Sequence, residues 1–264
     1  MISLKSADEM DTIARAGRIV ARVLEMVRER VEPGITTADL DAMAEDLIGE
    51  HDGATPAFKG LYGFPATLCT SINEEVVHGI PSRDRELASG DLLSVDVGVK
   101  LQGYFADSAV TVPVGDVGET SRRLLDVTRE ALRRGIEQAR PGGRVGDIGA
   151  AVQAHVEAQG FSVIRELVGH GVGHAAHEDP QVPNYGTEGR GQELREGLVI
   201  AIEPMVNVGG RRIREMDDGW TVVTADGSLS AHFEHTVAVT RDGPRILTTL
   251  EASTAVKGEG RDVG

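Results

Sequence analysis

Apolar side chains recur at helical spacing through the first fifty residues of the chain. The pattern predicts a helix over residues 7–31, which Pro33 interrupts. A second helix is predicted over residues 38–53, where Thr36 or Thr37 can cap the first turn. Both helices present one apolar stripe, so we expect them to serve as scaffold.

The same plan occurs a second time later in the chain. Residues 119–139 and 146–160 predict another pair of helices, again separated by a Pro-Gly break. At the offset between the two breaks, Asp39 falls on Asp147. The repeat indicates two halves related by a pseudo-two-fold axis, with a site between them.

Short β-prone runs follow each helix pair. The first half has a predicted strand at residues 66–72 and a predicted hairpin, described below. In the second half the predicted strands cover residues 162–167, 198–208, 213–216, 220–224 and 232–240.

Two carboxylates interrupt the predicted hairpin. Its strands, residues 92–97 and 105–112, flank a turn-like segment at residues 100–103. Regular pairing about the centre of that turn places Asp96 opposite Asp107, with their Cβ atoms about 5 Å apart. Like charges in a half-buried sheet need a shared proton or a cation, and we favour a cation.

Other acids and imidazoles stand where core residues are expected. The segment at residues 169–178, GHGVGHAAHE, includes His170 and His177 among three glycines, a composition that lets backbone and imidazole approach a ligand. Glu203 ends an apolar strand and Glu234 lies within another. Taken singly, each acid could be a salt-bridged core residue, and the histidine segment an ordinary glycine loop.

As a set, these residues have the composition of a dinuclear metal site. Four carboxylates and one imidazole suit two bridged divalent ions such as Mn, Fe, Co or Zn better than a structural zinc. Such ions support hydrolysis, in which Glu203 could also shuttle a proton. Cys69 has no base nearby in sequence and no Gly-x-Ser-x-Gly motif occurs, so covalent nucleophilic catalysis has little support. The expected ligands are Asp96, Asp107, His170, Glu203 and Glu234.

Composition narrows the classes of protein to consider. The 264 residues include a single cysteine, which excludes an intramolecular disulfide framework. A net charge of −15 without a basic stripe argues against a nucleic-acid partner. No run is apolar enough for a membrane span or a secretion signal, so we expect a cytoplasmic protein that does not enter membranes.

We expect one catalytic domain over residues 1–250 and a mobile tail over 251–264.

Five segments of the chain, taken together, carry a resemblance to a known family. They are SINEEVVHGIP (71–81), DVGVKLQGYFADSAVT (96–111), GHGVGHAAHEDPQVPNYG (169–186), IEPMV (202–206) and DGWTVVTADGSLSAHFEHTVAVT (218–240). With these segments in this order, the chain closely resembles the type I methionine aminopeptidases, which are metallopeptidases of the pita-bread fold. The resemblance implies an α+β fold of two pseudo-symmetric halves, with helices packed outside a curved antiparallel sheet.

The resemblance implies removal of the initiator methionine from nascent chains with a small second residue, by a water that two metal ions bridge and activate. The four acids and one imidazole above match the family's metal ligands. His78 matches a substrate-contacting histidine, and His177 one that binds the scissile amide oxygen or stabilises the tetrahedral intermediate. Family members also bind a monovalent cation near the positions of Asn73, Glu75 and Ser230.

The methionine pocket departs from the family pattern. By resemblance its wall includes Phe58, Leu61, Phe64, Cys69, Ala176 and Trp220. Several relatives have Tyr or Cys where this chain has Leu61, Phe64 and Phe58, and many have a bulky residue in place of Ala176. The pocket stays apolar, which favours methionine. His174 replaces a residue that is often Arg, and its role stays open between a functional imidazole and an exposed side chain.

The expected partners are nascent polypeptide N-termini, with the ribosome as a candidate, and the protein is expected to be a monomer.

Two rival functions are compatible with the same fold. One rival is an Xaa-Pro aminopeptidase or prolidase, which shares fold and ligands but usually carries an extra N-terminal domain. The other is an inactive pita-bread protein that binds protein or RNA, for which five retained ligand residues would be costly.

Overall fold

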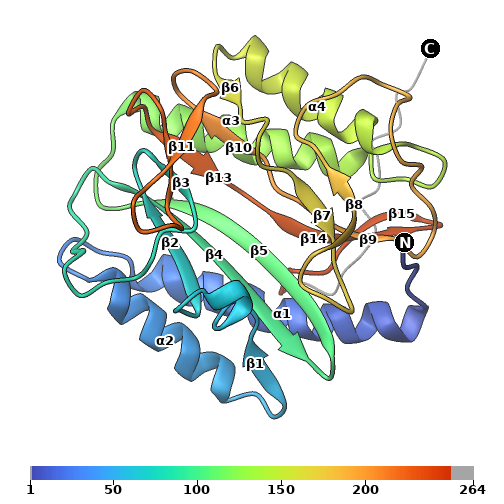
Figure 1. Ribbon diagram of the computed structural model, residues 1–264, viewed down its shortest axis with the longest axis horizontal. Helices are drawn as coiled ribbons and strands as arrows, with labels where there is room; N and C mark the ends of the chain where they lie inside the picture. The colour runs from blue at the N-terminus through green and yellow to red at the C-terminus, as the bar shows by residue number, and fades with distance from the viewer. Residues whose placement is uncertain (1, 251–264) are drawn as a thin grey trace.

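The computed structural model describes residues 2–250, so the tail expected at residues 251–264 lies outside the described residues. Helices form where the apolar periodicity predicts them, in two pairs (Figure 1). A short 3₁₀ turn, Leu61–Gly63, lies between the first two strands of the chain. The helices are α1 (Ala7–Arg30), α2 (Thr37–Gly49), α3 (Glu119–Glu137) and α4 (Val145–Ala158).

Corresponding carboxylates begin the second helix of each pair. The backbone N–H of Thr36 donates to Asp39 at 3.2 Å where α2 starts. The backbone N–H of Arg144 donates to Asp147 at 2.7 Å where α4 starts. A carboxylate in the first turn satisfies an orphan donor and complements the helix dipole. The match of Asp39 with Asp147 is therefore a repeat of structure as well as of sequence.

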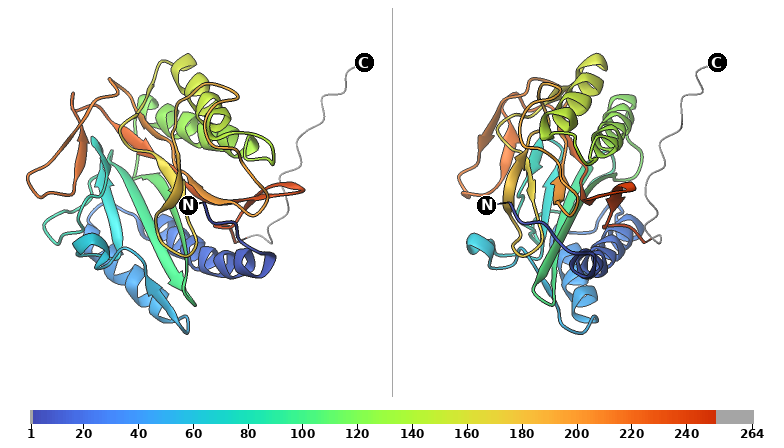
Figure 2. Two further views of the ribbon diagram at one scale, coloured as in Figure 1. Left: turned by 45° about the vertical axis from the view of Figure 1, so that its right-hand side comes forward. Right: turned by 90° about the vertical axis from the view of Figure 1, so that its right-hand side faces the viewer.

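The strands are all paired antiparallel and form four hydrogen-bonded sheets between the helix pairs (Figures 1 and 2). The first has the order β1-β4-β2, with β5 also paired to β4, and the others are β13-β10-β6, β11-β12-β3 and β15-β14-β9-β7-β8. The strand bounds are β1 (Ala54–Pro56), β2 (Leu68–Ile72), β3 (Glu75–Val77), β4 (Leu92–Leu101), β5 (Tyr104–Pro113), β6 (Ser162–Val163), β7 (Gly169–Gly171), β8 (Glu178–Val182), β9 (Val199–Ile202), β10 (Met205–Asn207), β11 (Ile213–Glu215), β12 (Val222–Thr224), β13 (Ser230–His232), β14 (His235–Thr240) and β15 (Gly243–Ile246).

The expected pairing within the β4–β5 hairpin is wrong. The turn comprises only Gln102 and Gly103, both with positive φ (52° and 87°), which suits a two-residue hairpin turn. The shorter turn shifts the register, so Asp107 faces Gly98 and Asp96 faces Ala109. The two aspartates stay on one face of the ladder, as diagonal rather than direct neighbours.

Two predicted strands are interrupted at their acids. The run predicted over residues 198–208 divides into β9 and β10 at Glu203 and Pro204. The run over 232–240 divides at Phe233 and Glu234. Both glutamates therefore lie at breaks between strands, where a side chain can leave the pleat. The strands predicted over residues 66–72, 162–167, 213–216 and 220–224 are shorter than expected, whereas the two hairpin strands are longer. Strands β1, β3, β7, β8 and β15 were not predicted.

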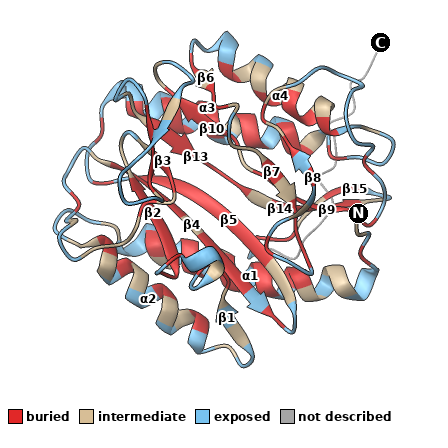
Figure 3. Cartoon of the chain, viewed as in Figure 1, coloured by how far each residue is buried: buried red, intermediate tan, exposed pale blue. Residues whose placement is uncertain are grey.

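One large apolar core joins both halves of the molecule. It extends from Ile13 on α1 to Leu247 after β15, and the buried faces of the helices point toward the strands (Figure 3). A smaller cluster around Phe58, Phe64 and Cys69 lies apart from that core. No helix of the described residues combines the length and the apolar character that crossing a membrane requires.

Candidate metal centre and active site

The five expected ligand residues converge on one cavity of about 160 Å³. They come from separate parts of the chain, so only the fold brings them together. Asp96 is on β4, Asp107 on β5 and His170 on β7, while Glu203 follows β9 and Glu234 precedes β14. Asp107 and Glu234 are buried, and the other three are half-buried.

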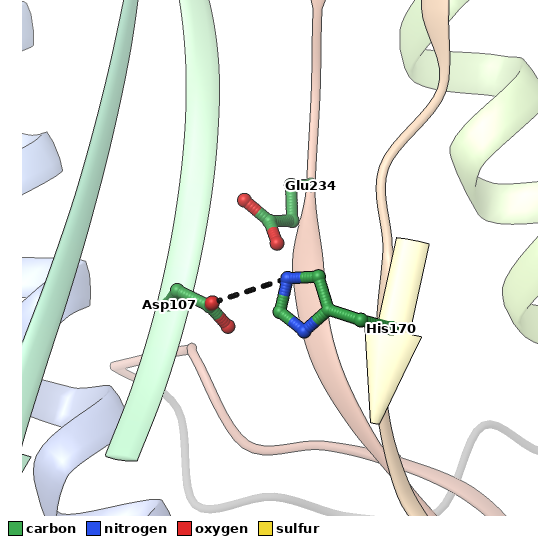
Figure 4. A group of neighbouring side chains, drawn as sticks. All are labelled: Asp107, His170 and Glu234. Carbon is green, nitrogen blue, oxygen red and sulfur yellow. Dashed lines mark ion pairs between the residues drawn. The ribbon is translucent and has the colours of Figure 1, made fainter. Parts of the chain in front are cut away.

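Three of these residues lie close enough to share one ion. Ligand atoms of Asp107, His170 and Glu234 all lie within 4.8 Å of one another (Figure 4). The Nε2 atom of His170 lies 3.6 Å from Asp107 Oδ2 and 3.5 Å from Glu203 Oε1. Its Nδ1 lies 2.9 Å from the carbonyl oxygen of Gly171. Because a carbonyl only accepts, Nδ1 carries the proton and Nε2 presents its lone pair to the cavity.

Hydrogen bonds from neighbouring segments hold three of the acidic residues in place. The hydroxyl of Thr236 on β14 lies 3.0 Å from Asp107 Oδ1 and 2.8 Å from the Asp107 carbonyl oxygen, to either of which it can donate. The hydroxyl of Ser108 donates to the carbonyl oxygen of Glu234. Asn184 donates to the carbonyl oxygen of Glu203 at 2.9 Å. These contacts hold Asp107, Glu203 and Glu234 in place through residues that are distant in sequence.

The carboxylates of the cavity have no lysine or arginine beside them among the described lining residues. Burial, and then the charge of Asp107, raise the pKa of Asp96, whose Oδ1 atom is buried without a hydrogen-bond partner among the described residues. Burial and neighbouring carboxylates likewise raise the pKa of Glu203 and of Glu234. This donor set fits divalent cations.

Two predicted histidines stand at the cavity beside the carboxylates. His78 is half-buried and its backbone has a φ of 61°, a strained conformation that is often found at functional sites. Burial lowers the pKa of His78. The ring of His177 lies 4.5 Å from that of His170, between centroids. Displacement of water by surrounding protein, and then the charge of His170, lower the pKa of His177.

An apolar pocket of about 200 Å³ adjoins the metal cavity and shares Phe58, His78, Asp96 and His177 with it. Ala176, expected in its wall, is buried but is not among the described residues that line the pocket. The other expected wall residues do line it, namely Phe58, Leu61, Phe64, Cys69 and Trp220.

Two ring-bearing residues of the site, Tyr62 and His232, were not predicted from the sequence. Tyr62 lines the pocket, has a φ of 51° and stacks on His177 with ring centroids 5.9 Å apart. His232 lines the metal cavity, and its Nε2 lies 3.8 Å from Glu203 Oε2. Burial lowers the pKa of His232 to about 3, so the ring stays neutral. Its place two residues before Glu234 was the available signal.

Other candidates lie outside the two cavities. His174 is exposed, and its Nε2 lies 3.4 Å from a carboxylate oxygen of Glu9, which places it away from the carboxylate cluster. Of the expected monovalent-cation residues, Ser230 donates through its backbone to the carbonyl oxygen of Asn73 at 2.9 Å. The carboxylate of Glu75 is paired with Arg85.

Comparisons with known proteins agree with the arrangement of the site. The metallopeptidase family M24 matches residues 11–241. The methionine aminopeptidase of Clostridium perfringens is 52% identical over 251 residues, which cover 95% of this chain and 100% of that relative. Methionine aminopeptidase 1 of Bacillus subtilis is 50% identical over 250 residues, which cover 95% of this chain and 100% of that relative.

Solved structures confirm the expected pita-bread fold. The crystal structure of methionine aminopeptidase from Thermotoga maritima has a TM-score of 0.93 at 46% identity, covering 94% of this chain and 100% of that one. A prolidase from Pyrococcus furiosus has a TM-score of 0.75 at 25% identity, covering 94% of this chain and 66% of that one. The chain therefore belongs to metallopeptidase family M24 and groups within it with the methionine aminopeptidases.

Proposed function

We propose that this chain is an aminopeptidase that uses two divalent metal ions to remove N-terminal methionine from peptides and nascent proteins with a small second residue. One observation carries the proposal. Four carboxylates and the imidazole of His170 come from separate elements to line a cavity that has no lysine or arginine among its described lining residues, directly beside an apolar pocket. The high identity with methionine aminopeptidases supports the same substrate class.

The ions would be held by the five residues that were expected from the sequence. The Oδ1 atom of Asp96, which has no hydrogen-bond partner within residues 2–250, and the raised pKa values of Asp96, Glu203 and Glu234 fit this role. When bound, such ions supply an activated water and polarise the scissile carbonyl. The ligand set we propose is Asp96, Asp107, His170, Glu203 and Glu234.

The other steps fall to side chains of the chain itself. Glu203 borders the cavity and has a raised pKa, so it can take a proton from the attacking water and pass it to the leaving amine. His177 has a lowered pKa and is neutral near neutral pH, where it can donate a hydrogen bond to the amide oxygen as negative charge develops. His78, on the wall that the two cavities share, would contact the substrate backbone.

The apolar pocket would bind the methionine side chain. Phe64 packs edge-on against Trp220, with ring centroids 5.1 Å apart, and Cys69 is buried at the pocket wall. Burial of a flexible thioether chain against aromatic and sulfur groups is favourable. Burial also raises the pKa of the Cys69 thiol well above its usual value, which keeps the thiol neutral and apolar.

A peptide comparison tests the proposal against its rivals. Metal-loaded protein should release methionine from Met-Ala-Ser and should leave Leu-Ala-Ser and Ala-Pro-Ala largely intact. Cleavage before proline would instead indicate the prolidase-like function, whose structural match has lower identity. No cleavage of any peptide would favour the inactive binding protein. A cytoplasmic location, a monomeric state and docking on the ribosome stay predictions of the sequence.

A further inference from the structure

A buried ion pair outside the metal cavity joins the start of the chain to the segment that carries His177. The ammonium of Lys5 pairs with Glu178 Oε2, and the two side chains are 1% and 13% exposed. The Lys5 backbone is also held, because its N–H donates to the carbonyl oxygen of Gly197 at 2.6 Å. Lys5 is therefore fixed at both its backbone and its side chain.

The second oxygen of the same carboxylate holds the loop that precedes His177. Glu178 Oε1 accepts from the backbone N–H of His174 at 2.6 Å and of Ala175 at 3.0 Å. Gly173 packs against the Lys5 stem so closely that a Cβ at this position would lie 2.3 Å from Lys5 Cε. One carboxylate thus connects Lys5 to two amides just before His177.

The other contacts of the loop lie at its start. The backbone N–H of Phe105 donates to the carbonyl oxygen of Gly173 at 2.7 Å, and the ring of His174 lies beside Tyr104. His174, Ala175 and His177 are exposed, and the side chain of His177 contacts aromatic rings rather than hydrogen-bond partners among the described residues. A buried ion pair adds little net stability compared with apolar residues of the same volume, whereas it can specify one geometry. The Lys5–Glu178 pair is placed to specify the geometry of this loop.

We propose that Lys5 is a positioning residue that acts through Glu178 to hold the loop over residues 173–177, and thereby the imidazole of His177, at the active site. Its catalytic consequence rests on the proposed function. Its structural part, that Lys5 orders the loop, stands on the contacts alone.

The first test measures loop order without reference to activity. Lys5→Met removes the ammonium while keeping an unbranched stem. In amide hydrogen exchange of the full chain, with and without added manganese, the N–H groups of His174 and Ala175 should exchange about tenfold faster or more in this variant. Arg241→Met, which removes a positive charge from an exposed pair with Glu196, is the matched control and should leave both rates unchanged. Unchanged exchange in Lys5→Met would overturn the proposal.

The second test measures the effect on His177. Lys5→Met should lower kcat on Met-Ala-Ser by about 10- to 100-fold, with KM and bound metal nearly unchanged. In a His177→Ala background, Lys5→Met should cause no further loss, because its effect passes through the missing imidazole. A full additional loss in that background would show a general structural role and would overturn the positioning role.

If Lys5→Met fails to fold, a second variant tests the same proposal. Glu178→Gln keeps an oxygen for the two amides but loses the charge that Lys5 neutralises, so we expect the same acceleration of exchange. If wild-type protein hydrolyses no peptide, the proposed function fails, and hydrogen exchange still decides whether Lys5 orders the loop.

Discussion

Asp107 faces Gly98 across the β4–β5 ladder, and the residue directly opposite Asp96 is Ala109. Each aspartate is thus paired with a residue that has little or no side chain. The two carboxylates share one face as diagonal neighbours, and the missing side chain of Gly98 lets Phe58 pack close to the ladder. The metal cavity and the apolar pocket meet at this face of the ladder, since Asp96 and Phe58 line both.

The lack of a side chain at Gly98 should therefore control the size of the pocket. A Cβ there would lie 2.7 Å from Phe58 Cε1 and 2.9 Å from Ala57 Cβ, so Gly98→Ala should push the Phe58 ring into the pocket. Overpacking of this kind costs about 1–3 kcal/mol, and we expect KM for Met-Ala-Ser to rise about tenfold with bound metal unchanged. Gly118→Ala, where a Cβ would meet no atom within 4 Å, is the control for steady-state kinetics. An unaltered KM in Gly98→Ala would refute this role of the glycine.

Asp96→Asn should separate stability from metal binding. The variant removes a buried negative charge that other carboxylates repel, so the metal-free protein should become more stable by about 1 kcal/mol or more. The same change should abolish most of the rise in melting temperature that added metal causes. Thermal unfolding with chelator and with manganese measures both effects, and Asp126→Asn, at an exposed position, should change neither. A metal-free Asp96→Asn variant that is less stable than metal-free wild-type protein would argue against repulsion among these carboxylates.

The raised pKa values of Asp96, Glu203 and Glu234 predict a pH dependence whose sign depends on metal. The metal-free folded protein binds protons on these acids more tightly than the unfolded chain does. Its free energy of unfolding should therefore fall as pH rises from the pKa values of these acids in the unfolded chain, about 4, through their pKa values in the folded protein. Metal binds the deprotonated acids, so its stabilisation should grow with pH.

Melting temperatures at about pH 6 and about pH 8 test this dependence. The difference between wild-type protein and Asp96→Asn, both with chelator, isolates the cluster from other titrating groups. Wild-type protein should be the less stable of the two by a larger margin at the higher pH. A margin that shrinks as pH rises would contradict the assigned directions of the pKa shifts.

His177→Ala should impair turnover without releasing metal. The loss of one hydrogen-bond donor to the developing oxyanion typically lowers kcat by about 10²- to 10³-fold. Metal analysis of the dialysed variant should match that of wild-type protein, because His177 is not among the proposed ligands. Asp107→Asn is the contrasting variant and should lose metal itself. Normal turnover by His177→Ala would remove its proposed role.

Much of the fold follows from local signals in the sequence. Helix α1 begins at a Ser6–Glu9 capping box, which follows from residue types three positions apart. Glu203 and Glu234 stood out because an acid in an apolar run has a cost that needs an explanation. Asp96 and Asp107 were correctly assigned to one face of a hairpin. These predictions needed only short-range patterns.

Other features depend on contacts that no local pattern reports. The hairpin register was wrong because Gln102 adopts a positive φ, which is uncommon for a residue other than glycine. Strand β7, Gly169–Gly171, has no residue with strong β preference and exists because β8 and β9 pair with it. Lys5 is adjacent to Glu178 only after the first and last thirds of the molecule have packed together.

The most direct test of the central claim is methionine release from Met-Ala-Ser by metal-stripped protein titrated with Mn, Fe, Co or Zn. We expect no release before metal is added, release that rises with added metal and stops with chelator, and almost none from Asp107→Asn at the same metal concentration. Release that persists in stripped protein, or no release with any of the four metals, would contradict a metal-dependent methionine aminopeptidase.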